Sequence, residues 1–135
     1  MISKSKLLVA ATFGVASVIV VPTAVDAGTT VTWPLQTDLS TYAWGALGDV
    51  RNSASSNEYI GCTFYANVNA ALTEVQCTAR DANNQVFWCH STDANIRSVA
   101  ASMTANSFVF FNGTNGGACT YLQIDNFSYL RPTTP

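Results

Sequence analysis

The chain has 135 residues, of which 48% are hydrophobic and 10% are charged, and its formal net charge at pH 7 is −2. This length allows one small domain with a hydrophobic core but leaves no room for a second. Residues 28–135 contain no lysine, and their acidic residues outnumber their arginines. Nucleic acid and anionic lipid attract basic surfaces, so the composition argues against both as partners.

The first 27 residues have the pattern of a secretory signal peptide, in a bacterial style. They begin with a basic segment, continue with an apolar run from Leu7 to Val21, and end with a small-residue cleavage site at Ala27. The alternative is an uncleaved membrane anchor, but the run is short for a bilayer span and Pro22 ends it. We therefore predict a signal peptide at residues 1–27.

Residues 28–135 then form a single disulfide-bonded β domain, which we expect to be secreted or periplasmic and free of the membrane after signal cleavage. All four cysteines remain in this part. An even number of cysteines in a small exported domain is typical of paired thiols in an oxidising compartment. Zinc is the alternative, but the chain has one histidine and no Cys-x-x-Cys pair. We expect no metal and no other cofactor.

Three consecutive strands are predicted in the segment that carries three of the four cysteines. Their ranges are Tyr59–Tyr65, Glu74–Arg80 and Gln85–Ser91. Polar and apolar residues alternate along the first two strands, and each cysteine falls on the apolar side. Asp and Asn residues at 81–84 supply the turn before the third strand. The cysteines are therefore expected to face the dry interior of a sheet.

The four cysteines can pair in three ways. A three-residue loop at residues 82–84 places Cys77 directly opposite Cys89. We favour a Cys77–Cys89 bridge for this reason, which leaves Cys62 to pair with Cys119. The main alternative joins Cys62 to Cys77 and Cys89 to Cys119. Loop-closure entropy gives about 7 kcal/mol for either set and does not separate them.

Two further strands are predicted before this segment. Gly28–Trp33 is rich in Thr and Val and is expected to be an edge strand that Pro34 ends. Tyr42–Asn52 alternates loosely, and Tyr42, Trp44 and Val50 are assigned to one of its faces.

After the segment, residues 93–103 follow the apolar spacing of a short amphipathic helix, which Thr92 or Asp93 can cap. Ser107–Asn112 is predicted as an aromatic strand, and Ala118–Leu130 as a final strand. The sequence as a whole predicts an all-β fold: an antiparallel β-sandwich or curled sheet of about six strands, with one short helix (93–103) and two disulfides.

No group of residues predicts catalysis, and we expect that the protein is not an enzyme. His90 follows Cys89 on a strand, so their side chains point to opposite faces and cannot form a catalytic dyad. No nucleophile-elbow motif is present. The acidic residues include no pair that the sequence marks for glycoside hydrolysis.

Aromatic side chains are the candidates for a binding site. Tyr59, Tyr65 and Trp88 fall on the face opposite the cysteines, where they can stack on sugar rings or anchor a protein partner. The alternative is that the helix or the N-terminal strand covers them. Our first hypothesis is a small secreted non-catalytic binding or surface module that recognises a carbohydrate or an extracellular protein.

Two other functions are compatible with the sequence. The first is an inhibitor of an extracellular protease, which would present Ala66–Thr73 or Gly113–Gly117 as a rigid exposed loop. The second is self-assembly into a coat or filament through edge strands.

Overall fold

A computed structural model describes residues 30–66 and 73–130, so the predicted signal peptide lies outside the described residues. Seven strands form one sheet, in the order β1-β2-β6-β7-β5-β4-β3. The strands are β1 (Gln36–Asp38), β2 (Tyr42–Ala46), β3 (Tyr59–Ala66), β4 (Thr73–Arg80), β5 (Val86–Ser91), β6 (Phe108–Gly113) and β7 (Gly117–Asp125). The helices are α1 (Leu47–Arg51) and α2 (Ala94–Ala100). The all-β prediction is confirmed, with seven strands rather than six and a second short helix.

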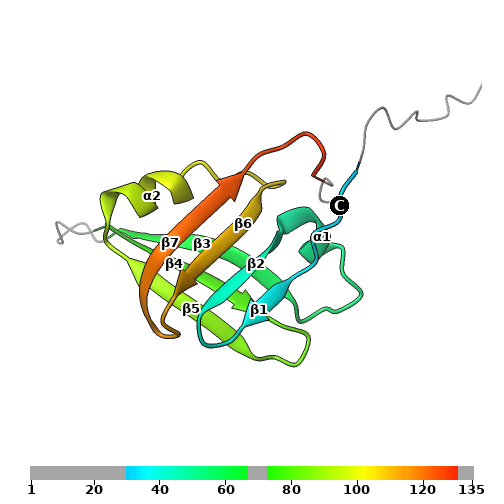
Figure 1. Ribbon diagram of the computed structural model, residues 1–135, viewed down its shortest axis with the longest axis horizontal. Coiled ribbons are helices and arrows are strands. Elements are labelled where there is room, and N and C mark those ends of the chain that lie inside the picture. Colours follow the sequence, from blue (N-terminus) through cyan, green and yellow to red (C-terminus); the bar gives the residue numbers. More distant parts are fainter. Residues whose placement is uncertain (1–29, 67–72, 131–135) are drawn as a thin grey trace, which may run out of the picture.

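The sheet curls into two layers, which Figure 1 shows one in front of the other. Strands β1, β2, β6 and β7 make the front layer, and β3, β4 and β5 make the back layer. The two layers join where β5 and β7 run parallel for two residue pairs, Cys89 with Gly117 and His90 with Ala118. We call this junction the seam. The other strand pairings are antiparallel, so the sheet is mixed.

The core lies between the two layers and follows the period-two alternation of the strands. Its fully buried side chains include Val75, Cys77 and Ala79 of β4, Phe87 and Cys89 of β5, Ala43 of β2, and Val109 and Phe111 of β6. Phe87 and Phe111 stack with their ring centroids 5.5 Å apart, so one aromatic pair connects the back layer to the front layer.

The disulfides join Cys62 to Cys77 and Cys89 to Cys119. The favoured pairing of Cys77 with Cys89 and Cys62 with Cys119 is therefore wrong, and the alternative is correct. The expected register holds, since Cys77 does lie opposite Cys89. Cys77 also lies opposite Cys62 on its other side, and the seam brings Cys119 close to Cys89. Two disulfides indicate an oxidising environment, either extracellular or periplasmic.

The segment predicted as one strand from Tyr42 to Asn52 divides into β2 and α1. Tyr42 and Trp44 share the outer face of β2, whereas Ala43 and Gly45 face the core. Val50 reaches the core from α1 and packs over Gly45, where an added Cβ would lie 3.0 Å from its methyl carbon. The predicted strand at 28–33 is reduced to an isolated parallel bridge between Val31 and Leu130.

The predicted helix at 93–103 forms as α2, which is shorter by a few residues. Asp93 caps it, because its side chain accepts hydrogen bonds from the backbone N–H groups of Asn95 and Ile96. Ala100 is buried, and the helix packs against β7 and β4. In the two described ranges, no helix has the length and apolar character needed to span a membrane.

A bulge in the β6–β7 hairpin sets which side chains of β7 face the core. Asn112 pairs with Tyr121 but Gly113 pairs with Cys119, so Thr120 has no opposite residue. The extra residue allows both Cys119 and Leu122 to be buried, although they are three positions apart. An added Cβ at Gly113 would lie under 3.0 Å from the carbonyl oxygen of Ala118, so the bulge requires glycine.

Candidate functional site

The three aromatic residues predicted as a binding face lie on the outer side of the back layer but are not neighbours. Tyr59 and Tyr65 are 41% and 51% exposed and stand near opposite ends of β3. They are six positions apart along the strand, which corresponds to about 20 Å. Tyr59 instead packs under the guanidinium of Arg80, whose central carbon lies 4.7 Å from the ring centroid. The side chains between the tyrosines include the polar Thr63 and Gln76.

Trp88 is half-buried beneath the turn that follows β6. Its backbone carbonyl accepts a 2.8 Å hydrogen bond from the N–H of Gly116, and its N–H donates to the side chain of Asn115 at 3.2 Å. Its ring stacks on His90, with the centroids 5.9 Å apart. Trp88 therefore supports this turn, and its position separates it from the two tyrosines.

This turn, Gly113–Gly117, is one of the two loops that the sequence offers for protease inhibition. Its central side chain, Asn115, makes contacts within the molecule. The amide of Asn115 donates to the carbonyl oxygens of Leu39 and Val86 at 2.9 and 3.2 Å. It thus ties together both layers at this end of the molecule. The other candidate loop, Ala66–Thr73, lies mostly outside the described residues.

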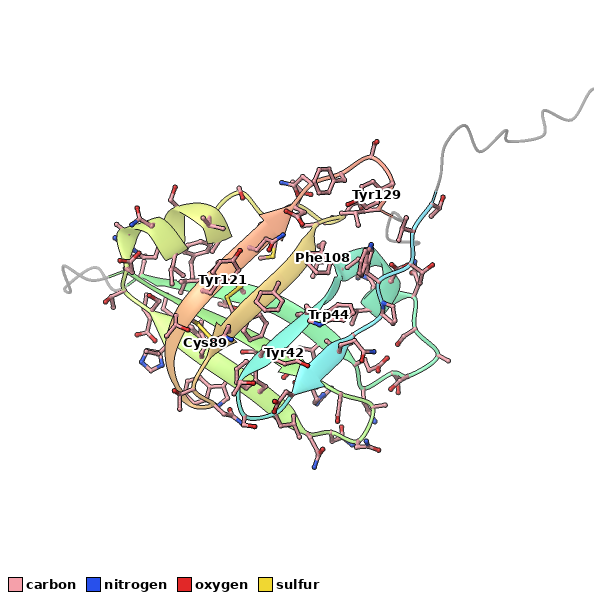
Figure 2. All side chains as sticks on the ribbon, viewed as in Figure 1. Tyr42, Trp44, Cys89, Phe108, Tyr121 and Tyr129 are labelled. Atoms are coloured by element: carbon pink, nitrogen blue, oxygen red, sulfur yellow. A yellow bond between two sulfur atoms is a disulfide. The ribbon has the colours of Figure 1, made fainter. Side chains whose placement is uncertain are left out.

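A continuous group of aromatic side chains lies elsewhere, on the outer face of the front layer (Figure 2). We call this group the aromatic platform; it comprises Trp33, Tyr42, Trp44, Phe108, Phe110, Tyr121 and Tyr129. Figure 2 shows the labelled members on neighbouring strands and on the segment after β7, although they are far apart in the sequence.

Strand register explains why the platform is continuous. Trp44 pairs with Phe110, which pairs with Gln123, so three outward side chains form one row across β2, β6 and β7. The next row contains Tyr42, Asn112 and Tyr121. Side chains on one face of neighbouring strands lie about 5 Å apart, which allows rings in adjacent rows to touch.

Ring contacts join six of the seven members in two groups, which lie side by side because Trp44 is opposite Phe110. In the first group, the centroid of Trp33 lies 5.8 Å from that of Trp44 and 5.6 Å from that of Phe108. In the second group, the centroid of Phe110 lies 6.1 Å from that of Tyr42 and 5.6 Å from that of Tyr121. Mutual packing holds each ring in place without burying it completely.

A polar ladder follows the β7 side of the platform. The hydroxyl of Tyr121 donates to the side-chain oxygen of Gln123 at 3.2 Å. The amide nitrogen of Gln123 donates to Asp125 at 2.8 Å. These three residues occupy alternate positions, so they share the outer face. Their remaining donor and acceptor capacity is available beside the rings.

A groove of about 310 Å³ lies at one end of the platform. Its lining residues are Trp33, Trp44, Phe108, Phe110, Gln123, Asp125, Tyr129 and Leu130. Within residues 30–66 and 73–130, Asp125 supplies the one carboxylate of this lining, and no arginine of these ranges belongs to it. The groove therefore combines an apolar floor with an uncharged amide and a single carboxylate.

Both ends of the described chain build the wall of this groove. The N–H of Val31 donates to the carbonyl oxygen of Tyr129 at 3.2 Å, which holds the two end segments together. The N–H of Trp33 donates to a carboxylate oxygen of Asp49 at 2.6 Å. Asp49 is only 7% exposed and belongs to α1. This buried acid thus fixes the position of a tryptophan at the groove.

Sequence reasoning missed the platform because the signal is distributed over distant segments. The alternation of Tyr42 with Trp44 and of Phe108 with Phe110 is visible in the sequence. What the sequence does not show is that β2 and β6 are neighbours. Within the described residues, no group of three His, Cys, Asp or Glu side chains could hold a metal ion.

Comparisons of the chain with protein-family models, with curated proteins and with solved structures found no match.

Proposed function

We propose that the protein is a non-catalytic binding module that holds a neutral carbohydrate on the aromatic platform. The observation that carries this proposal is the continuity of the platform beside a polar ladder. Sugar rings present apolar C–H faces and hydroxyl edges. Aromatic rings can pack on the first, and an amide and a carboxylate can hydrogen-bond the second.

Charge supports a neutral ligand rather than an acidic one. Among the described residues, the groove lining has a carboxylate, Asp125, and no basic side chain. An anionic sugar would meet the like charge of Asp125 there. The hydroxyl groups of a neutral sugar can instead bond to Asp125 and Gln123.

The groove also favours binding over hydrolysis. Glycoside hydrolases use two carboxyl groups, about 5–5.5 Å apart in retaining enzymes and about 6.5–9.5 Å apart in inverting enzymes. In the part of the chain that the structure describes, Asp125 has no second acid beside it in the groove lining. We therefore propose recognition without bond cleavage. An extracellular protein is the alternative partner, and the protease-inhibitor hypothesis stays a prediction.

The proposal is tested by affinity electrophoresis and pull-down with a panel of neutral polysaccharides: cellulose, xylan, mannan, starch and chitin. We expect at least one of them to retain the wild-type protein. Trp44→Ala removes a central ring of the platform, and we expect it to weaken retention by about tenfold or more. Tyr59→Ala, which removes an exposed ring from the back layer, is the matched control and should bind like the wild type.

Two outcomes would contradict this proposal. One is that none of the polysaccharides retains the wild type. The other is that Tyr59→Ala loses retention while Trp44→Ala keeps it, which would move the site to the face predicted from the sequence. Circular dichroism must show that both variants are folded.

We also propose that the domain acts outside the cytoplasm after removal of residues 1–27. The two disulfides support this compartment. N-terminal sequencing of the protein recovered from the periplasm or culture medium tests the cleavage site. A first residue of Gly28 is expected, and recovery of the intact chain with Met1 from the cytoplasm would contradict the proposal.

A further inference from the structure

The two edge strands of the sheet differ in length and chemistry. β1 has three residues and includes the charged Asp38. β3 has eight residues and contains neither a charged residue nor a proline. Natural edge strands are usually short, charged or interrupted, because an uncharged edge can pair with another strand. β3 lacks these protections.

The hydrogen-bonding direction of β3 follows from its pairing with β4. The Cα atoms of Cys62 and Cys77 are 4.0 Å apart, which is the close spacing of a non-hydrogen-bonded antiparallel pair. The backbone N–H and C=O of Cys62 therefore point away from β4. Alternation gives the same direction to those of Phe64. The outer edge of β3 thus presents backbone donors and acceptors at alternate residues.

An open hollow lies on the outer face of β3 at Gly61. An added Cβ at this glycine would have no other atom within 4 Å. A shallow depression of about 350 Å³ surrounds it, and its lining includes Tyr59, Thr63 and Tyr65. Tyr65 is 51% exposed on the same face. The strand therefore carries both a projecting ring and an empty space.

We propose that two copies of this chain pair through β3, antiparallel, about a two-fold axis at Thr63. Gly61 and Tyr65 lie at equal distances on either side of this residue. The two-fold axis places the Tyr65 ring of each copy over the Gly61 of the other. An aromatic side chain across from a strand glycine covers its exposed backbone.

The same register satisfies the free backbone groups. It sets Cys62 of one copy opposite Phe64 of the other, and these are the residues whose N–H and C=O point outward. The occupant is a second copy because the ring and the hollow are on the same strand at symmetric positions. The absence of charge on β3 removes repulsion between the two identical edges. This inference does not depend on the carbohydrate proposal, which concerns the front layer.

Gly61→Val gives a specific test. The added side chain has space in the monomer and suits a strand, so the fold should be kept. It fills the hollow that Tyr65 of the other copy would occupy. Sedimentation equilibrium of the oxidised protein over a concentration series should show a dimer for the wild type and dimerisation weakened by about tenfold or more for Gly61→Val.

Thr63→Cys tests the register. The two-fold axis makes the two Thr63 residues a non-hydrogen-bonded pair, whose close Cβ atoms permit a disulfide. Mild oxidation should cross-link this variant across the dimer. Thr120→Cys, on the exposed part of β7, is the control and should not cross-link under the same conditions. Peptide mapping must show both native disulfides in each variant.

A wild type that is monomeric at every concentration would overturn the proposal. So would a dimer that Gly61→Val leaves intact, or a Thr63→Cys dimer that does not cross-link, because either result places the interface elsewhere.

Discussion

The front and back layers carry aromatic residues on their outer faces to very different effect. On the front layer, Trp44 and Phe110 are directly opposite each other on adjacent strands, and further rings extend the contact. On the back layer, Tyr59 and Tyr65 are on one strand with polar residues between them. The comparison shows that a continuous aromatic surface depends on pairing across strands more than on the aromatic content of any single strand.

The layers are also braced differently. The disulfide Cys62–Cys77 lies within the back layer, whereas Cys89–Cys119 crosses the seam and holds the layers together. The stacked aromatic pair Phe87–Phe111 also connects the two layers. The predictions below test these differences, from the largest expected effect to the smallest.

Phe110 and Phe111 are adjacent on β6, so their side chains point to opposite faces of the front layer and allow the two faces to be compared. Phe111→Ala removes a fully buried ring that stacks on the back layer, and it should lower the free energy of unfolding by about 3–5 kcal/mol. Phe110→Ala removes a half-buried ring of the platform and should cost about 1 kcal/mol. Urea unfolding measures both. Equal losses would mean that the platform is a second core rather than an exposed surface.

Removing each disulfide compares the seam with the back layer. The bonds close loops with sequence separations of 30 and 15 residues, for Cys89–Cys119 and Cys62–Cys77 respectively. Replacing Cys89 and Cys119 by alanine should lower the free energy of unfolding by about 3–4 kcal/mol. Replacing Cys62 and Cys77 by alanine should lower it by about 3 kcal/mol. Only the variant without Cys89–Cys119 should also show faster backbone hydrogen exchange in both layers. Increased exchange confined to β3 and β4 in that variant would contradict the bracing role of the seam.

Asp49→Ala tests how the wall of the groove is held. The variant leaves the N–H of Trp33 without its carboxylate partner, which should cost about 1–3 kcal/mol of unfolding free energy. It should also weaken polysaccharide retention, because Trp33 belongs to the platform. Asp49→Asn keeps an acceptor and serves as the matched control, with a smaller effect on both measurements. Unchanged retention in a folded Asp49→Ala variant would show that Trp33 does not contribute to binding.

The smallest effect is expected at Asp38, on the exposed end of the front layer. Hydrogen bonds from the hydroxyl and N–H of Ser40, and from the hydroxyl of Thr41, hold the pKa of this carboxyl below its ordinary value of 3.8. A lowered pKa means that the ionised form is favoured in the folded state. Its contribution to stability is therefore present above pH 3.8 and is lost as the pH falls through the lowered folded pKa.

Asp38→Asn should accordingly be slightly less stable than the wild type near neutral pH and equal to it in acid. Thermal unfolding at a series of pH values measures the difference, and NMR titration of the Asp38 carboxyl carbon measures the pKa. A difference between the two proteins that grows as the pH falls would have the wrong sign for this explanation.

Local features of the fold could be predicted from the sequence. The strands of the back layer, the cap at Asp93 and the turn at residues 81–84 follow from alternation and from short-range hydrogen bonding. In that turn Asp81 accepts from Asn83 and Gln85, and Asn84 has a φ of 64°. Each of these structures is determined by residues that are close together in the chain.

Features that join distant segments could not be predicted in this way. The seam pairs β5 with β7, and the platform needs β2 beside β6; both arrangements depend on how the whole sheet curls. For the same reason the sequence could not decide between the two disulfide pairings or show that the aromatic side chains of β2 and β6 form one surface.

The position of Cys77 between two other cysteines has a consequence for oxidative folding. Its side chain lies opposite Cys62 on one strand and opposite Cys89 on the other. During folding, a Cys89 thiolate can attack the Cys77 sulfur and release the Cys62 thiolate, which exchanges the correct bond for the neighbouring one. Renaturation of the reduced chain should accumulate this isomer unless a thiol buffer or a disulfide isomerase allows the bonds to rearrange.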